Sequence, residues 1–323
     1  MKKHIFYISL LSIVLVLTAC DQDSMAPFAS KYPSVDERFV ISMLYNRDIG
    51  GYDTLQAKSE EYKIYVCTDT HLNVPHINLR DAELRGDDPL KLVSNLATFI
   101  QLYRADTLCP AAVCLGDLVE SDITYDVFRY PLEKIPLNPN KYDTMYCTIG
   151  NHDVFYRQYY AYRYHIAKAS TYCFVVKTPS GKKDLYICLD TATGSLGRKQ
   201  TEWLKGILAQ ANDQSWSSDY YRHIIVYTHV NIFRRDNTSA DISTTAIEET
   251  NELLYLFRKY NVKQFWAGHD HSREEFMQGG VKYIIVDSME EDNPNAAFMI
   301  LHVGEELNNT FHSIIPYKTN FGL

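Results

Sequence analysis

Two histidines two residues apart, in Gly268-His269-Asp270-His271, are residue types that could bind a metal ion. They follow the apolar run 264–267, so we expect them in a loop at the carboxyl end of a strand, where ligands gather in open α/β sheets. Neutral imidazole is the commonest protein ligand of metal ions. A solvated surface loop is the alternative that this motif alone leaves open.

Four other polar stretches each come directly after an apolar, strand-like run. They are Asp69-Thr70-His71, Gly116-Asp117, Gly150-Asn151-His152-Asp153 and His229. Strand ends can converge in space even when they lie far apart in the sequence. Together these side chains offer carboxylates, an amide and imidazoles without a thiolate, a donor set suited to zinc, iron or manganese. Seven ligands exceed what one tetrahedral ion takes, and they fit two ions that share a bridging carboxylate and a bridging water.

Strands and helices must position these residues. The two kinds of element alternate early in the chain, and strands dominate later. Strand-like runs end near positions 68, 115, 149, 227 and 266, and helical patterns separate several of them. The turn Pro179-Ser180-Gly181 predicts a β-hairpin, and three more strands are expected after position 280. This order predicts two packed sheets with helices outside.

The segment before the first of these strands has fewer signals. Ser34-Val35-Asp36-Glu37 has the form of a capping box and predicts a short helix to about Tyr45. Residues 46–59 are expected to be loop. A second long polar loop is expected before a helix that starts at Asp87-Asp88-Pro89.

Composition limits the class of protein. The 323 residues carry a formal charge of −8 and no basic stretch, which argues against general nucleic-acid binding. Cys67, Cys114, Cys147 and Cys188 lie in apolar strand-like runs, so buried thiols are the expected state.

The first twenty residues have the pattern of a targeting segment. Lys2 and Lys3 precede an apolar run, and Leu17-Thr18-Ala19-Cys20 ends it with small residues before a cysteine. The pattern resembles a bacterial lipoprotein signal, with Cys20 as the lipidated residue; an ordinary cleaved signal peptide or an N-terminal anchor is the alternative. We therefore expect a signal peptide at 1–19, a tether with a short helix at 20–60, and one domain at 61–323. The protein would be exported and lipid-anchored to a membrane on its periplasmic or cell-surface side.

With all five blocks in order, residues 61–303 resemble the calcineurin-like metallophosphoesterases, whose blocks are D-x-H, G-D, G-N-H-[DE], a lone H and G-H-x-H. The resemblance implies a four-layer αββα sandwich of two mixed β-sheets flanked by helices. It implies a dinuclear centre of divalent or trivalent Mn, Fe or Zn. The ligands implied for the first ion are Asp69, His71 and His271, and those for the second are Asn151, His229 and His269. Asp117 would bridge both ions.

The same resemblance implies roles in catalysis. His152 would protonate the leaving oxygen, and Glu120 or Asp153 would orient it. A hydroxide that bridges the metal ions would attack phosphorus in a small phosphomonoester or phosphodiester. Position 120 is not tyrosine, which argues against the purple acid phosphatase branch, and Asp117 lacks the Asp-Arg-Gly that follows in protein phosphatases.

Other features leave the substrate open. Cys188-Leu189-Asp190-Thr191 gives a loose likeness to the class III cyclic-nucleotide phosphodiesterase branch. One alternative is a nucleotide or lipid-headgroup pyrophosphatase. Another is a metal-containing surface lipoprotein that binds ligands without turnover.

Overall fold

The structure is a computed structural model, which describes residues 32–48, 53–120, 123–137, 144–155, 158–212, 221–233 and 247–314. All described residues belong to one compact unit. Cys20 and the expected signal peptide lie outside the described residues.

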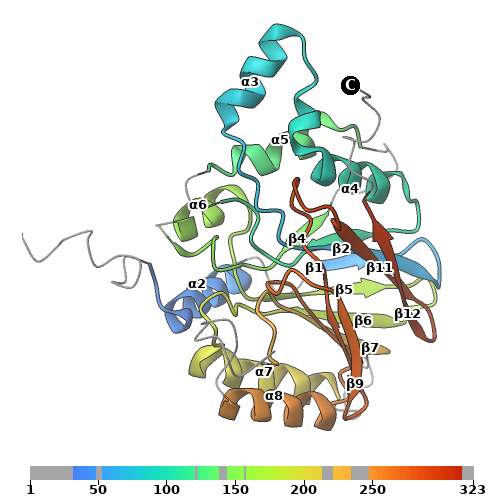
Figure 1. Cartoon of the computed structure of the whole chain (residues 1–323). Helices are drawn as coiled ribbons and strands as arrows, with labels where there is room; N and C mark the ends of the chain where they lie inside the picture. The colour runs from blue at the N-terminus through green and yellow to red at the C-terminus, as the bar shows by residue number, and fades with distance from the viewer. Residues whose placement is uncertain are drawn as a thin grey trace, which may run out of the picture. The chain divides into compact units, whose positions relative to one another are not determined.

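Strands and helices alternate through most of this unit (Figure 1). The strands are β1 (Asp53–Gln56), β2 (Tyr62–Cys67), β3 (Ala111–Cys114), β4 (Met145–Cys147), β5 (Tyr172–Lys177), β6 (Lys183–Cys188), β7 (His223–Tyr227), β8 (Gln264–Ala267), β9 (Glu274–Gln278), β10 (Val281–Ile285), β11 (Ala297–Val303) and β12 (Leu307–Ser313). The helices are α2 (Val35–Asp48), α3 (His76–Arg85), the 3₁₀ helix η2 (Pro89–Val93), α4 (Ser94–Ala105), α5 (Asp126–Lys134), α6 (Gln158–His165), α7 (Gly197–Ala211) and α8 (Ile247–Lys259).

The strands form two mixed sheets, as expected. One sheet has the order β1-β5-β6-β7-β8-β10-β9, and the other has the order β12-β11-β2-β3-β4. Strands β6, β7 and β8 run parallel to one another, as do β2, β3 and β4. The hairpin at Pro179-Ser180-Gly181 joins β5 and β6 as an antiparallel pair, which confirms that prediction.

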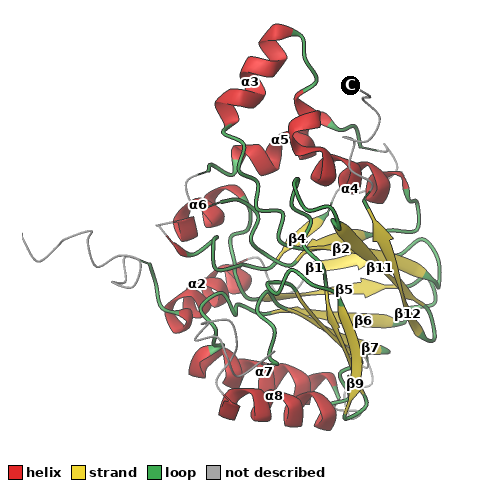
Figure 2. Ribbon diagram, in the orientation of Figure 1, coloured by secondary structure: helices red, strands yellow, loops and turns green. Residues whose placement is uncertain are grey.

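The pleat of each strand divides its side chains between two cores. In β2, Ile64 and Val66 pack between the sheets against side chains that include Trp266, whereas Tyr65 and Cys67 face the core on the side of α4 and α5. A third core lies between the other sheet and helices α7 and α8. Helices therefore cover both outer faces of the paired sheets, and the expected four-layer αββα architecture is confirmed (Figure 2).

The folded unit begins earlier than the expected boundary at residue 61. The capping box forms, since the backbone N–H of Ser34 donates to Glu37 Oε2 at 2.8 Å, but the helix continues to Asp48. Its Arg38 is fully buried and pairs with Asp190. Part of the expected loop at 46–59 is β1, which pairs in parallel with β5. The segment 20–60, expected to be a tether with a short helix, therefore contributes both that helix and a strand to the domain.

Helix α3 lies where a long polar loop was expected. Only Leu79 and Ala82 of its ten residues are buried. Two buried positions give almost no apolar periodicity, so the pattern could not separate this helix from a loop.

The six cysteines of the described residues are all buried, and none of these six forms a disulfide with another. This agrees with the buried thiols expected at Cys67, Cys114, Cys147 and Cys188. Among the described residues, no helix has the length and apolar character needed to cross a bilayer.

Candidate metal centre

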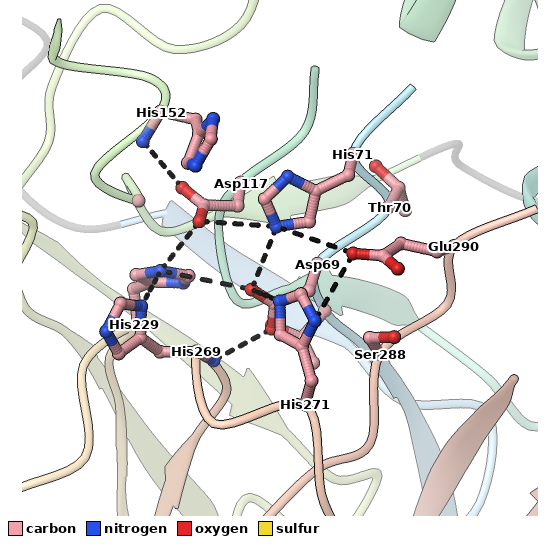
Figure 3. Close-up of polar contacts among 12 residues, drawn as sticks. Asp69, Thr70, His71, Asp117, His152, His229, His269, His271, Ser288 and Glu290 are labelled. Atoms are coloured by element: carbon pink, nitrogen blue, oxygen red, sulfur yellow. Dashed lines mark hydrogen bonds and ion pairs between the residues drawn. The ribbon is translucent and has the colours of Figure 1, made fainter. Parts of the chain in front are cut away.

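Five loops bring the side chains of the motifs together. Three of the loops follow the parallel strands β2, β3 and β4 of one sheet, and two follow β7 and β8 of the other. Asp69, Asp117, His229 and His271, which lie up to 202 positions apart in the sequence, meet in one cluster (Figure 3). The expectation that these strand ends converge is therefore confirmed by the geometry.

The loops that carry the cluster adopt a costly backbone conformation. Asp69, His71, Asp117, His269 and His271 all have positive φ, between 37° and 69°. This region is sparsely populated by residues other than glycine, and such outliers concentrate at functional sites. Backbone hydrogen bonds between the loops hold the conformation, among them the N–H of His71 to the carbonyl of Asp117 at 3.0 Å.

Gly268, directly after β8, packs tightly against the loop that follows β2. A Cβ at this position would lie 1.9 Å from Thr68 Oγ1 and 2.5 Å from Asp69 Oδ2. The close approach lets the backbone N–H of His269 donate to Asp69 Oδ2 at 2.8 Å, and Thr68 Oγ1 donates to the same oxygen at 2.6 Å. These bonds satisfy Oδ2 and leave Oδ1 of Asp69 directed into the cluster.

Asp69 Oδ1 is the centre of a first group of donor atoms. His271 Nε2 lies 3.4 Å from this oxygen and His71 Nε2 lies 3.6 Å from it. His71 Nε2 is also 3.5 Å from Asp117 Oδ2. Because Asp69, His71 and His271 can each offer one atom to a common point, the three could hold a metal ion.

Asp117 Oδ2 also belongs to a second group. His229 Nε2 lies 3.2 Å from this oxygen and 3.0 Å from Asn151 Oδ1. His269 Nδ1 lies 3.2 Å from His229 Nε2. Asp117, His229 and His269 can likewise share one ion, and Asp117 is placed between the two groups.

The chemistry of the cluster fits bound cations. Asp69 Oδ1 and His71 Nε2 are buried and have no hydrogen-bond partner. Although burial would raise it, the pKa of Asp69 is held well below its ordinary value by His229 and by the neighbouring imidazoles of His271 and His71. Buried orphan atoms beside ionised carboxylates are what a metal ion would satisfy.

The histidines of the cluster differ in their protonation. Burial lowers the pKa of His71 and of His229, but the adjacent carboxylates outweigh it and raise the two values to about 9 and about 10. Burial and the charge of His229 lower the pKa of His269 to about 4. In the metal-free protein, His71 and His229 thus carry protons that a bound metal ion would replace.

The structure distinguishes the two carboxylates expected near His152. Glu120 Oε2 lies 3.2 Å from His152 Nδ1, and Glu120 Oε1 lies 2.9 Å from His71 Nδ1. Asp153 is fully buried and accepts hydrogen bonds from the backbone N–H groups of Asp117 and Gly150, both at 2.9 Å. The contacts of Asp153 therefore hold the loops together, and Glu120 is the carboxylate against His152.

One acidic side chain of the site was missed by the sequence analysis. Glu290, in the loop after β10, places Oε1 3.2 Å from His271 Nδ1 (Figure 3). No motif surrounds it in the sequence. The only signal was its position beyond a strand, which many surface glutamates share.

Comparisons with known proteins agree with this geometry. The sequence profile described as calcineurin-like phosphoesterase matches residues 62–273. Among solved structures, a dimetal phosphatase from Danio rerio is similar, with 15% identity and a TM-score of 0.55 over 78% of this chain and 96% of that chain. GAP50, the anchor in the inner membrane complex of Plasmodium, has 14% identity and a TM-score of 0.52 over 78% and 84% of the two chains.

A third similar structure is the purple acid phosphatase PPD1 from yellow lupin seeds, with 12% identity and a TM-score of 0.52. That alignment covers 81% of this chain and 52% of the lupin protein. A search of curated protein sequences finds no match. At these identities the structural likeness establishes the fold alone.

Proposed function

Since this chain belongs to the calcineurin-like phosphoesterase family, we propose that it hydrolyses phosphoric monoesters or diesters with the help of two bound metal ions. One observation carries the proposal: Asp69 Oδ1 and His71 Nε2 are buried without a hydrogen-bond partner at the point where the donor groups meet. An unsatisfied buried polar atom costs about 1–3 kcal/mol. A bound cation would satisfy both atoms at once.

The proposed ligands follow the two groups of donors. Asp69, His71 and His271 would hold one ion, Asn151, His229 and His269 would hold the other, and Asp117 would contact both. Mn, Fe and Zn, divalent or trivalent, match this oxygen and nitrogen set. When bound, the ions would neutralise phosphoryl oxygens and lower the pKa of a water molecule to about 7, which provides the nucleophile.

His152 would supply the proton that the leaving oxygen needs. Its side chain is 30% exposed, and its Nδ1 faces Glu120. A carboxylate at Nδ1 accepts the hydrogen on that nitrogen and directs Nε2 toward the substrate, as required of a general acid. Glu120 would act through His152 and is a positioning residue in this proposal.

The leaving group tests the role of His152. His152→Ala should leave metal binding intact and lower kcat by about 100- to 10,000-fold for an alkyl phosphoester. An aryl ester such as para-nitrophenyl phosphate should lose much less, because its leaving group hardly needs a proton. Equal losses on both substrates would contradict the acid role.

A direct assay tests the function itself. The purified chain, loaded with Mn²⁺, Fe²⁺ or Zn²⁺ in turn, should hydrolyse para-nitrophenyl phosphate or its bis-ester, and the ratio of the two rates gives the substrate class. Hydrolysis of a nucleotide pyrophosphate in preference to both would identify a pyrophosphatase. Metal binding without turnover on any substrate would contradict the enzyme and favour a ligand-binding protein.

We also propose that the protein works outside the cytoplasm, anchored by acyl chains on Cys20. The support is the sequence pattern of residues 1–20. A radiolabelled fatty acid should be incorporated into the wild-type chain and not into Cys20→Ala. Equal labelling of the two, or no labelling of either, would contradict the anchor.

A further inference from the structure

The loop after β10 brings Glu290 to the rim of the first group of donors. Its Oε1 lies 3.2 Å from His271 Nδ1 and 3.9 Å from His71 Nε2 (Figure 3). Its side chain is 27% exposed, so the carboxylate is partly withdrawn from solvent. A carboxylate in this place adds negative charge beside two imidazoles that the proposed function assigns to one metal ion.

Backbone contacts hold Glu290 in this place. The N–H of the preceding residue, the buried Met289, donates to the carbonyls of Thr68 and Asp69, both at 3.1 Å. The carbonyl of Glu290 accepts a hydrogen bond from Asn95 Nδ2 at 2.7 Å. Glu290 is therefore tied to the same loop that carries Asp69.

The residue after Glu290 is anchored as well. Glu291 accepts hydrogen bonds from the Ser94 hydroxyl at 2.7 Å and from the backbone N–H of Asn95 at 2.8 Å, at the first turn of α4. A carboxylate at a helix N-terminus meets unpaired N–H groups and the positive end of the helix dipole. Both neighbours of Glu290 are thus held, which fixes the backbone from which its side chain extends toward His271.

The contact with His271 repeats an arrangement found at two other histidines of the site. In each of the three, Nε2 faces the carboxylates and Nδ1 faces an acceptor on the outside. The pairs are His229 with the carbonyl of Leu115 at 2.8 Å, His71 with Glu120 Oε1 at 2.9 Å, and His271 with Glu290 Oε1 at 3.2 Å. An imidazole that binds a metal through Nε2 carries its hydrogen on Nδ1, so the acceptor sets both the tautomer and the orientation of the ring.

His271 has the greatest need of such an acceptor. Its side chain is 38% exposed, whereas His71 is 8% exposed and His229 is fully buried. Its backbone has a φ of 47° and lies in a loop, outside any helix or strand. Core packing can hold the rings of His71 and His229, whereas the Nδ1 edge of the more exposed His271 faces Glu290.

We propose that Glu290 is a positioning residue that fixes the ring of His271 for metal binding. The inference rests on the proposed function only in requiring that this site hold a metal ion. It adds a carboxylate to the centre that none of the five motifs contains.

Metal titration of the full chain tests the proposal without a turnover assay. Mn²⁺ binding to the metal-free protein should weaken by about 10- to 100-fold for one of two ions in Glu290→Ala. Glu290→Gln keeps an oxygen acceptor and should recover part of the affinity. Asp292→Asn is the matched control, because it removes the same charge from an exposed residue two positions along the same loop, and it should bind like the wild type.

A spectrum gives a second readout. The visible absorption bands of the Co²⁺-loaded protein should change in Glu290→Ala and stay unchanged in Asp292→Asn, because the bands report the ligand geometry. Far-ultraviolet circular dichroism of each metal-free variant checks that the fold is intact, and Glu290→Gln is the variant that decides if Glu290→Ala does not fold.

Three results would overturn the role of Glu290: wild-type affinity in Glu290→Ala, an equal loss in Asp292→Asn, or no recovery in Glu290→Gln. A wild-type chain that binds no Mn²⁺ or Co²⁺ would overturn this proposal and the proposed function together. A chain that binds two ions and hydrolyses no phosphoester would contradict the proposed function alone.

Discussion

The buried pair of Arg38 and Asp190 should decide whether helix α2 stays docked on the domain. Arg38 Nε and Nη2 donate to the two carboxylate oxygens of Asp190 at 2.7 and 2.8 Å, and both side chains are fully buried. Removing one partner of such a pair leaves an uncompensated charge in the core and costs about 3–5 kcal/mol. This is a large share of the roughly 5–15 kcal/mol that stabilises a typical domain.

The comparison of single and double variants tests this reasoning. Arg38→Met and Asp190→Leu should each lower the free energy of unfolding by about 3–5 kcal/mol, whereas the double variant should lose less than either, because no charge remains unpaired. Lys134 and Glu83 provide a matched control. They also pair at 2.7 Å, but they are 46% and 50% exposed, so Lys134→Met should cost less than about 1 kcal/mol.

Urea unfolding of the metal-free chain, followed by circular dichroism, measures these differences. Losses below about 1 kcal/mol in both single variants, equal to the exposed control, would refute the claim that the buried pair holds α2. Additive losses in the double variant would refute the claim that the two side chains act on each other.

Three further predictions concern the metal centre. Burial lowers the pKa values of His71 and His229, but nearby carboxylates raise them to about 9 and about 10. Metal binding at pH 7 should therefore release about two protons, measured by calorimetry in buffers of different ionisation enthalpy, and release of none would contradict the protonated state. Protonated His71 and His229 should also stabilise the metal-free protein. Their contribution to the free energy of unfolding should be complete below the unfolded pKa of about 6.5 and lost as pH rises through 9 to 10. A free energy of unfolding that stays constant over this range would contradict the prediction. Gly268→Ala should cost about 1–3 kcal/mol and weaken metal binding, because its Cβ would lie 1.9 Å from Thr68 Oγ1. Gly206→Ala, on an open helix face, should instead be neutral or stabilising by up to about 1 kcal/mol, and equal effects of the two would contradict the packing argument.

The sequence was most informative about features that local patterns determine. Continuous apolar runs predicted the central strands, and the blocks at their ends predicted which side chains meet. Ser34 and Glu37 predicted a helix start because the capping box is made by residues three positions apart. Parallel strands of one sheet end at a common edge, so the sequence alone was enough to place Asp69 and Asp117 close together.

Features that depend on distant partners could not be predicted in the same way. Arg38 looked like one more charged residue on a short helix, because its partner Asp190 is 152 positions away. Residues 53–56 carry no strand pattern of their own and become β1 by pairing with β5. The choice between Glu120 and Asp153 also required the fold, because the sequence neighbour of His152 is Asp153, whereas the carboxylate that contacts its ring is Glu120, 32 positions away.

The most direct test of the metal centre is anomalous diffraction from crystals of the Mn²⁺-loaded protein, recorded on both sides of the manganese absorption edge. The account predicts two peaks, one bounded by Asp69, His71 and His271, the other by Asn151, His229 and His269, with Asp117 in contact with both. A map without peaks among these side chains, or with its peaks elsewhere in the molecule, would contradict it.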